Sequence, residues 1–332
     1  MIWSFSTIKQ FSRCQRQWYL KNYVANWHAE EDSIEKEVYL LSKLSSVFAW
    51  RGKVVDKVIE NHIVRPLHFG DKLDENSVMK QAHELFNRQL AFARTNRLRE
   101  PGMTVSKAGD DFAALRDVDY QRDVPKDLID QAWSDVETAL VNLFAMKDLI
   151  RRMRKACALI AQRPLVFTLS GLKSDLIKVR AVPDLIVFSE KGFPLIIDWK
   201  VHSFGRVDYR LQLACYALAV TQCNPHRDFP ASISGYEPTD IELWEVQLLT
   251  NRVRRYELTE DDIYELEAYI TETSKLMELA ISGFDKETLS PLDFPVTYYP
   301  KTCVHCSFQR ICWEDSIWEK DQPKEWKQIS LL

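Results

Sequence analysis

Two aspartates and a lysine form the pattern with the clearest chemical use. Pro183-Asp184 is followed, after thirteen residues, by Asp198-Trp199-Lys200. Two carboxylates held close together raise the pKa of one of them, and a divalent cation such as magnesium or manganese, which prefers oxygen ligands, removes that conflict. Asp198 and Lys200 are two positions apart, so both point to one face of a strand. The pattern predicts a metal site at which Lys200 orients water or stabilises a phosphate group. The alternative is two turn or edge aspartates beside a salt-bridged lysine.

A glutamine and a tyrosine interrupt an otherwise apolar segment. Gln212 and Tyr216 are four positions apart, so they share one face of a helix. A buried glutamine needs hydrogen-bond partners. We expect both side chains to face the metal site or a nucleic-acid backbone, and the alternative is a glutamine bonded to neighbouring backbone.

An acidic stripe is predicted on an earlier helix. Gly52, Asp56 and Glu60 follow one another at intervals of four. An aspartate at the border of an apolar face, one turn from a glutamate, is unfavourable without a cation. The alternative is an exposed acidic edge paired with Lys53 or Lys57.

Three cysteines near the end of the sequence could hold a soft metal. Cys303, Cys306 and Cys312 supply three thiolates, whereas a tetrahedral or cubane site needs four ligands. Cys14, in the predicted N-terminal helix, is the best fourth candidate. A structural zinc site that uses His305 is the alternative. The other cysteines lie in apolar helical settings and are predicted to be buried small hydrophobic residues: Cys157, Cys215 and Cys223.

The elements that must position these residues change in character along the chain. Residues 6–24, 33–64 and 71–160 are predicted to be helical, with Pro66 ending the second helix. Strands are predicted at 165–169, 176–188 and 193–202, as successive strands of an antiparallel meander. A buried helix over 208–223, a hairpin of 240–249 with 252–258, and a helix over 260–282 follow.

Charge and hydropathy restrict the function classes. The net charge of −4 excludes a globally basic nucleic-acid binder but permits a local basic groove. Candidate phosphate contacts lie in two runs, Arg151, Arg152, Arg154 and Lys155, and Arg252, Arg254 and Arg255. For each of these residues the alternative is a solvated helix face or hairpin edge. The first residues lack a signal-peptide pattern and no apolar stretch could span a membrane, so we expect a cytoplasmic protein without membrane contact.

Taken in order, these motifs resemble those of the RecB-like branch of the PD-(D/E)XK nuclease superfamily. The nearest resemblance is to its iron–sulfur members, the CRISPR-associated RecB-like exonucleases and the nuclease domain of AddB. The matching residues run from Cys14 to Cys312 and span nearly the whole chain. In the family a histidine usually occupies the position of Asp56, and a proline commonly occupies that of Gln15. An aspartate can also bind magnesium.

The resemblance implies an α/β (α+β) fold with a restriction-endonuclease-like core, in which helices flank a mixed central sheet. It also implies a structural [4Fe–4S] cluster that joins the N- and C-terminal segments through Cys14, Cys303, Cys306 and Cys312. Residues 65–160 are predicted to form a helical insertion, which has no place in the family pattern. The expected parts are an N-terminal helix (1–30), a helical region (31–160), the nuclease core (161–260) and a C-terminal helix with the cysteine segment (261–332).

The resemblance further implies the roles of individual side chains. The catalytic residues would be Asp184, Asp198, Lys200, Gln212 and Tyr216. One or two magnesium or manganese ions would be held by Asp56, Asp184, Asp198 and the backbone carbonyl of Trp199.

The expected function is that of a metal-dependent deoxyribonuclease, which hydrolyses phosphodiester bonds as an exonuclease on single-stranded or free-ended DNA. Its setting would be DNA repair and recombination, or CRISPR and other antiviral defence. The expected partners are DNA and a helicase, integrase or other defence or repair protein. Two alternatives remain: a catalytically silent subunit with the nuclease fold that binds DNA or a partner protein, and a zinc-stabilised interaction module.

Overall fold

A computed structural model describes residues 2–171, 176–202, 208–224, 226–230, 235–282 and 289–313. The chain folds into two compact units. The first unit comprises residues 1–4, 47–90 and 124–272, and the second unit comprises residues 5–46, 91–123 and 273–332. No helix in the described part of the chain is long and apolar enough to cross a membrane.

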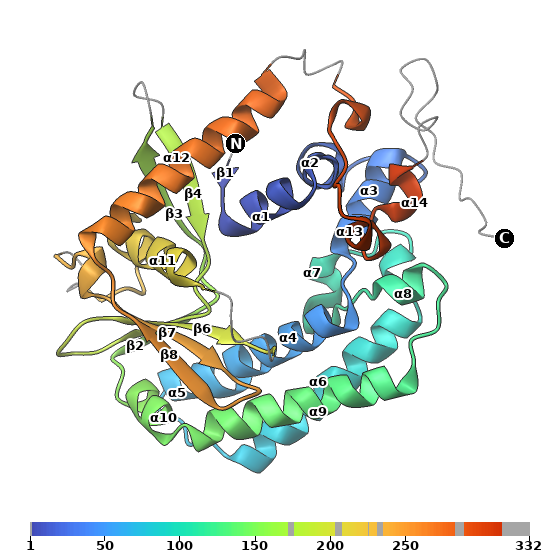
Figure 1. Ribbon diagram of the computed structural model, residues 1–332. Coiled ribbons are helices and arrows are strands. Elements are labelled where there is room, and N and C mark those ends of the chain that lie inside the picture. The colour runs from blue at the N-terminus through green and yellow to red at the C-terminus, as the bar shows by residue number, and fades with distance from the viewer. Residues whose placement is uncertain are drawn as a thin grey trace. The chain divides into compact units, whose positions relative to one another are not determined.

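The first unit contains a five-stranded mixed sheet (Figure 1). Its strands, in spatial order, are β2 (Ala158–Ala161), β5 (Leu185–Phe188), β6 (Leu195–Lys200), β7 (Glu242–Gln247) and β8 (Arg252–Tyr256). β6 and β7 run parallel, whereas the other neighbours are antiparallel. A parallel pair needs a crossover connection, and helix α11 (Arg210–Gln222) lies in it. The predicted mixed sheet with flanking helices is confirmed.

A second, three-stranded sheet belongs to the same unit. It has the order β1 (Ile2–Trp3), β4 (Leu176–Ala181) and β3 (Leu165–Ser170). Residues of β3 alternate between buried and exposed, so one face of this sheet is covered. Helix α11 packs against β3, β4 and β6 and is buried over most of its length, as its apolar sequence predicts.

The predicted strand over 176–188 and the single antiparallel meander are wrong. Residues 182–184 interrupt the strand, and its halves β4 and β5 pair in different sheets. Pro183 cannot donate a ladder hydrogen bond, which explains the break. The hairpin of β7 with β8 is confirmed, although each strand is shorter than predicted.

The helices of the first unit differ from prediction in two places. α4 (Val47–Val58) continues through a π-helical turn (Ile59–Val64) into α5 (Arg65–His68). The predicted stop at Pro66 is wrong, because Pro66 lies in the first turn of α5, where its missing N–H is tolerated. The helical prediction for 71–160 holds for α6 (Glu75–Arg94), α9 (Lys126–Ala145) and α10 (Lys147–Arg154). It fails at β2, where pairing with β5 prevails over local propensity.

The second unit is built from short helices. They are α1 (Phe5–Arg13), α2 (Gln15–Tyr19), a π-helical turn (Leu20–Val24), α3 (Ile34–Lys43), α7 (Val105–Ala108), α8 (Arg116–Asp119), α13 (Pro300–Val304) and α14 (Gln309–Cys312). The predicted helix over 6–24 is broken at Cys14, which has an extended backbone and accepts a hydrogen bond from the Gln17 N–H as the N-cap of α2. The predicted helix over 33–64 is broken between α3 and α4, where Ser45 forms a bridge with Leu115. The long helix α12 (Glu260–Ser282) has its predicted limits.

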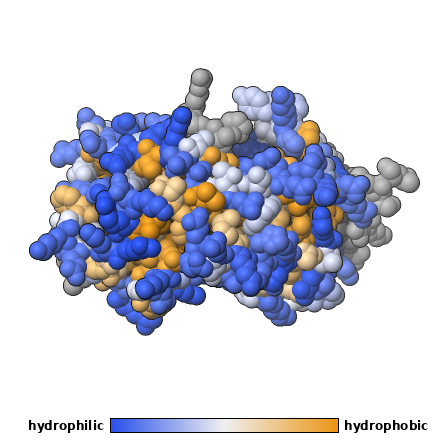
Figure 2. All heavy atoms as spheres, turned by 90° about the horizontal axis from the view of Figure 1, so that it is seen from below, coloured by the Kyte–Doolittle hydropathy of each residue, from blue (hydrophilic) through white to orange (hydrophobic). Residues whose placement is uncertain are grey.

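A hydrophobic cluster holds the second unit together. Its buried members come from the N-terminal, middle and C-terminal segments of the chain: Leu20, Ile34, Val38, Leu40, Leu41, Leu44, Leu98, Ala114, Tyr120, Phe308 and Ile311. Figure 2 shows one face of the molecule, on which hydrophilic side chains surround several patches of hydrophobic ones. Such a mixture is ordinary for a protein surface.

Candidate active site and cysteine pocket

Two aspartates meet where β5 and β6 pair. Asp184 directly precedes β5, and Leu185 pairs with Ile197 of β6, so Asp184 lies beside Asp198. The Trp199 N–H donates to Asp184 Oδ2 at 2.8 Å. Asp198 follows three apolar residues of β6 and is only 2% exposed, so its charge requires compensation by neighbouring groups.

Lys200 and Gln212 both engage the Asp198 carboxylate. Lys200 forms an ion pair with Asp198 Oδ2, and its ammonium lies 4.1 Å from the ring centroid of Tyr209. Burial lowers the pKa of Lys200, but the Asp198 charge raises it and the net direction is upward. Gln212 donates to Asp198 Oδ1 at 3.3 Å and to the Tyr216 hydroxyl at 2.6 Å. The structure therefore brings together all five predicted catalytic side chains: Lys200 and Gln212 contact Asp198, Tyr216 contacts Gln212, and Asp184 lies beside Asp198.

Helix α4 adds a third carboxylate to this environment. Burial, followed by the charge of Asp198, raises the pKa of Asp56 to about 7. Burial and the charges of Asp198 and Asp56 raise the pKa of Asp184 well above its ordinary value. Three carboxyl groups thus disfavour one another's ionisation, which a cation would relieve. Glu60 forms an ion pair with Lys57 at 3.2 Å, as the alternative interpretation of this stripe expects.

The donor chemistry fits a hard divalent cation such as magnesium or manganese, because the three carboxylates supply oxygen ligands. Within the described ranges, however, no group of three or more His, Cys, Asp or Glu side chains is arranged to hold a metal ion. Both oxygens of Asp184 accept hydrogen bonds, from the Trp199 N–H and from Gln162 Nε2 at 2.9 Å. Asp198 is engaged by Lys200 and Gln212, so an ion would replace some of these partners.

Glu245 is a buried acidic residue beside the site that the sequence analysis did not single out. In the parallel pairing of β6 with β7 it lies next to Asp198, and it is 0% exposed. Its carboxylate accepts hydrogen bonds from Gln247, from the Tyr256 hydroxyl at 2.7 Å and from Arg254 Nη1 at 3.2 Å. The available signal was an acidic residue between two apolar ones, Trp244 and Val246, on a predicted strand.

Helix α9, which belongs to the predicted helical insertion over residues 65–160, supports the ends of β6 and β7. Arg51 of α4 forms a partly buried ion pair with Asp135 of α9 and donates to the Val201 carbonyl at 3.0 Å. Asn142 of α9 donates to the Leu248 carbonyl at 2.7 Å. Val201 and Leu248 directly follow β6 and β7, so α9 braces the strand end that carries Lys200.

Strand pairing sorts the arginines of β8 onto two faces. Arg254 pairs with Glu245 and Arg252 with Gln247, so both project on the face of Asp198 and Lys200. Arg255 pairs with Trp244 and lies over its ring at 4.6 Å, on the opposite face.

The arginines of α10 are partly engaged already. Arg152 also lies over the Trp244 ring, at 4.9 Å, and forms an ion pair with Glu242 at 2.8 Å. Arg151 pairs with Asp148 at 2.6 Å. Arg154 lines an open polar pocket with Lys72, and Lys155 is exposed.

The second unit brings the four predicted cluster cysteines to one pocket. Its lining residues are Cys14, Gln17, Leu20, Val296, Thr297, Thr302, Cys303, Cys306, Phe308, Gln309, Cys312 and Trp313. Burial raises the pKa of the Cys306 thiol to about 12, and burial also raises those of Cys303 and Cys312. Cys14 and Cys312 are buried, whereas Cys303 and Cys306 are half-buried. Four thiols that line one pocket are suitable soft donors for iron or zinc once they lose their protons, although within the described ranges they are not arranged as a metal-binding group.

Two of the other cysteines match their prediction and one does not. Cys215 and Cys223 are buried. Cys157 is exposed, because it lies in the connection between α10 and β2 and not inside a helix as predicted. His305, the alternative zinc ligand, is not among the residues that line the cysteine pocket.

One of three comparisons with known proteins shows the family of this chain. No curated protein matches the chain significantly. Among solved structures, the crystal structure of SSO0001 has 11% identity and a TM-score of 0.31, and the match covers 71% of this chain and 97% of that one. A protein from Eubacterium rectale, described as a candidate exonuclease, has 11% identity and a TM-score of 0.29, with 75% and 84% coverage. Both TM-scores are too low to support a conclusion. A model of the PD-(D/E)XK nuclease superfamily, in contrast, matches residues 2–313. Because this match includes every residue of the carboxylate site and of the cysteine pocket, the chain belongs to the PD-(D/E)XK nuclease superfamily.

Proposed function

We propose that the protein is a metal-dependent deoxyribonuclease that acts as an exonuclease on single-stranded or free-ended DNA. The observation that carries this proposal is the meeting of Asp184 and Asp198 at the β5–β6 pair, with Lys200 on the same face. The raised pKa values of Asp56 and Asp184 support it, because such shifts are typical of sites built to hold a cation.

The metal ligands proposed are the carboxylates of Asp56, Asp184 and Asp198 and the carbonyl of Trp199. Members of this superfamily typically use divalent ions such as magnesium or manganese, and such an ion, when bound, lowers the pKa of a water molecule and offsets phosphate charge. Lys200, once released from Asp198, is close enough to the carboxylates to orient that water or to stabilise the charge that develops on the phosphate.

Gln212 and Tyr216 restrain the orientation of the Asp198 carboxylate. Gln212 donates to Asp198 and to Tyr216, so it restrains the carboxylate from the α11 side. In the proposed complex these two side chains also place the scissile strand. Arg252 and Arg254 are the preferred phosphate contacts, because they project on the catalytic face, whereas Arg255 and Arg152 are stacked on Trp244.

The cysteine pocket is proposed to hold a structural [4Fe–4S] cluster. Four thiols from the N-terminal and C-terminal segments line it, which is the ligand number of such a cluster. By the same resemblance, the protein would act in DNA repair and recombination, or in CRISPR and other antiviral defence, in the cytoplasm. Its partner there would be a helicase, an integrase or another defence or repair protein.

A catalytically silent DNA-binding subunit is the second candidate. Two observations favour it. Aspartate occupies position 56, and the Asp198 carboxylate is already engaged by Lys200.

Cleavage of end-labelled single-stranded DNA in the presence of manganese separates the two candidates. The protein would be purified without oxygen and compared with Lys200→Ala and with Lys191→Ala, an exposed lysine in the β5–β6 turn. The nuclease proposal requires that Lys200→Ala reduces the cleavage rate by about 100-fold or more while DNA binding persists. Lys191→Ala should cleave like the wild type. A wild-type protein that binds DNA without cleaving it would establish the silent subunit instead.

A further inference from the structure

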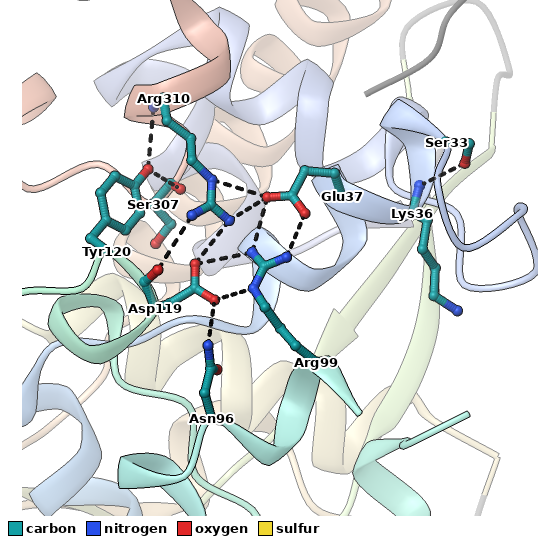
Figure 3. A network of polar contacts seen from close by, with 9 residues as sticks. All are labelled: Ser33, Lys36, Glu37, Asn96, Arg99, Asp119, Tyr120, Ser307 and Arg310. Atoms are coloured by element: carbon teal, nitrogen blue, oxygen red, sulfur yellow. Dashed lines mark hydrogen bonds and ion pairs between the residues drawn. The ribbon is translucent and has the colours of Figure 1, made fainter. Parts of the chain in front are cut away.

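A network of four buried or half-buried charges lies beside the cysteine segment of the second unit (Figure 3). The carboxylates belong to Glu37 of α3 and Asp119 of α8, which are 3% and 5% exposed. Arg99 donates to Glu37 at 2.7 and 3.0 Å and to Asp119 Oδ2 at 3.0 Å. Arg310 of α14 donates from Nε to Glu37 Oε1 at 3.0 Å and pairs with Asp119 Oδ2 at 2.9 Å.

Each carboxylate in this network depends on both arginines. Two negative and two positive groups balance, so the network as a whole is neutral. Removal of one guanidinium would leave two buried carboxylates to share one cation, which is far more costly than the loss of an exposed ion pair. The two carboxylates therefore strongly restrict the position of the Arg310 guanidinium.

Arg310 is placed to transmit this constraint to the cysteines. It lies between Cys306 and Cys312 in the sequence, and α14 ends at Cys312. Its backbone N–H donates to the Tyr120 hydroxyl at 3.2 Å, and that hydroxyl donates to the Ser307 carbonyl at 2.9 Å. None of these contacts uses a thiol, so they can form before any metal is bound.

A second arginine makes the reciprocal contact from the N-terminal segment. Arg16, two residues after Cys14, donates from Nη1 to the Cys312 carbonyl at 3.0 Å and from Nε to the Phe294 carbonyl at 3.1 Å. The hydrophobic partners Phe308 and Ile311 belong to the same core as α3. The cysteine segment is thus docked by polar and apolar contacts on both sides of the pocket.

We infer that Arg310 is a positioning residue for the cysteine pocket: Glu37 and Asp119 hold its guanidinium, and it fixes α14 so that Cys306 and Cys312 face Cys14 in the metal-free protein. The cluster is then assembled in a preformed site and does not have to fold the segment itself. The role of a preformed metal site rests on the proposed function of the pocket. The positioning of α14 by Arg310 does not depend on it.

The experiment compares the full-length wild type with Arg310→Met, Glu37→Gln and the control Arg97→Met. Arg97 belongs to the same unit and forms an exposed ion pair with Glu100. In metal-free, reduced protein, the labelling of each cysteine by a thiol reagent would be followed by mass spectrometry. We expect Cys306 and Cys312 to react about tenfold faster in Arg310→Met, since local opening governs access to buried thiols. Glu37→Gln, a neutral replacement of the same shape, should act in the same direction.

A second measurement follows iron in anaerobically reconstituted samples of the same proteins. Arg310→Met and Glu37→Gln should lose iron to a chelator about tenfold faster than the wild type and Arg97→Met, because the cluster ligands are then less restrained. Labelling and iron release that are the same in Arg310→Met, Glu37→Gln and Arg97→Met would overturn the inference. A wild type that takes up no iron, with thiol labelling as expected, would refute the cluster proposal and leave the positioning role of Arg310 established.

Discussion

Neutralising Asp56 should stabilise the metal-free protein at neutral pH. Its pKa is raised from 3.8 to about 7 by burial and by the charge of Asp198. That is a rise of roughly 3 pKa units at about 1.4 kcal/mol each, so ionised Asp56 costs at most about 4 kcal/mol of folding stability. Asp56→Asn keeps the shape of the side chain and removes this cost.

The pH dependence of the effect follows from the direction of the shift. The folded protein binds the Asp56 proton more tightly than the unfolded chain does. Stability from this group is therefore complete below about pH 4, falls as the pH rises to about 7, and is constant above. Asp56→Asn and the wild type should be similar near pH 4, and the variant should be more stable by a few kcal/mol, about 4 at most, at pH 8.

Urea unfolding in the presence of a chelator, followed by tryptophan fluorescence at several pH values, measures this difference. Addition of manganese at pH 8 should then stabilise the wild type more than the variant, because the aspartate is a proposed ligand. A difference in unfolding free energy between the two proteins that does not change between pH 4 and pH 8 would refute the reasoning that Asp56 is a strained, desolvated carboxylate.

Three further predictions concern contacts around the site. Glu245→Gln should lower the free energy of unfolding by about 2 kcal/mol, because three donors lose a charged acceptor; an unchanged urea midpoint would contradict this. Asp135→Asn should lower kcat about tenfold with little change in KM for DNA, since it weakens the brace through Arg51; steady-state kinetics would test it, and a rise in KM alone would argue against the brace. Arg252→Ala should reduce the slope of a plot of log DNA-binding constant against log salt concentration by about 1, whereas Arg255→Ala should leave that slope unchanged. Equal slopes for the two variants in fluorescence-anisotropy titrations would count against the placement of Arg252 and Arg255 on opposite faces of the sheet.

Features that depend on neighbours in the sequence could be predicted without the structure. Asp198 and Lys200 share a face because a strand repeats every two residues, and Gln212 and Tyr216 share a face because a helix repeats every 3.6 residues. The limits of α12 and the apolar character of α11 followed from the same periodicities. These relations are set by the local geometry of the backbone, which the residue order already contains.

Features that depend on pairing between distant segments could not be predicted. The break at Pro183 placed β4 and β5 in different sheets, and residues 158–161 became a strand because β5 offers them a ladder. The place of Glu245 beside Asp198 depends on the parallel register of β6 with β7, which no single strand specifies. In the same way, only the pairing of β8 decided which arginines share the catalytic face.

The motifs by themselves determined which chemistries were available to this protein: hard oxygen ligands with a lysine, and four soft thiols. Only the tertiary structure decided how these groups are held. The packing of α4 brings Asp56 close enough to Asp198 for their charges to interact. Arg51 of α4, paired with Asp135 of α9, holds the backbone directly after Lys200. Arg310 ties the cysteine segment to a neutral network of ion pairs. The physical reason is that burial and electrostatic coupling depend on distances in space, which segments far apart in the chain acquire only when they pack together.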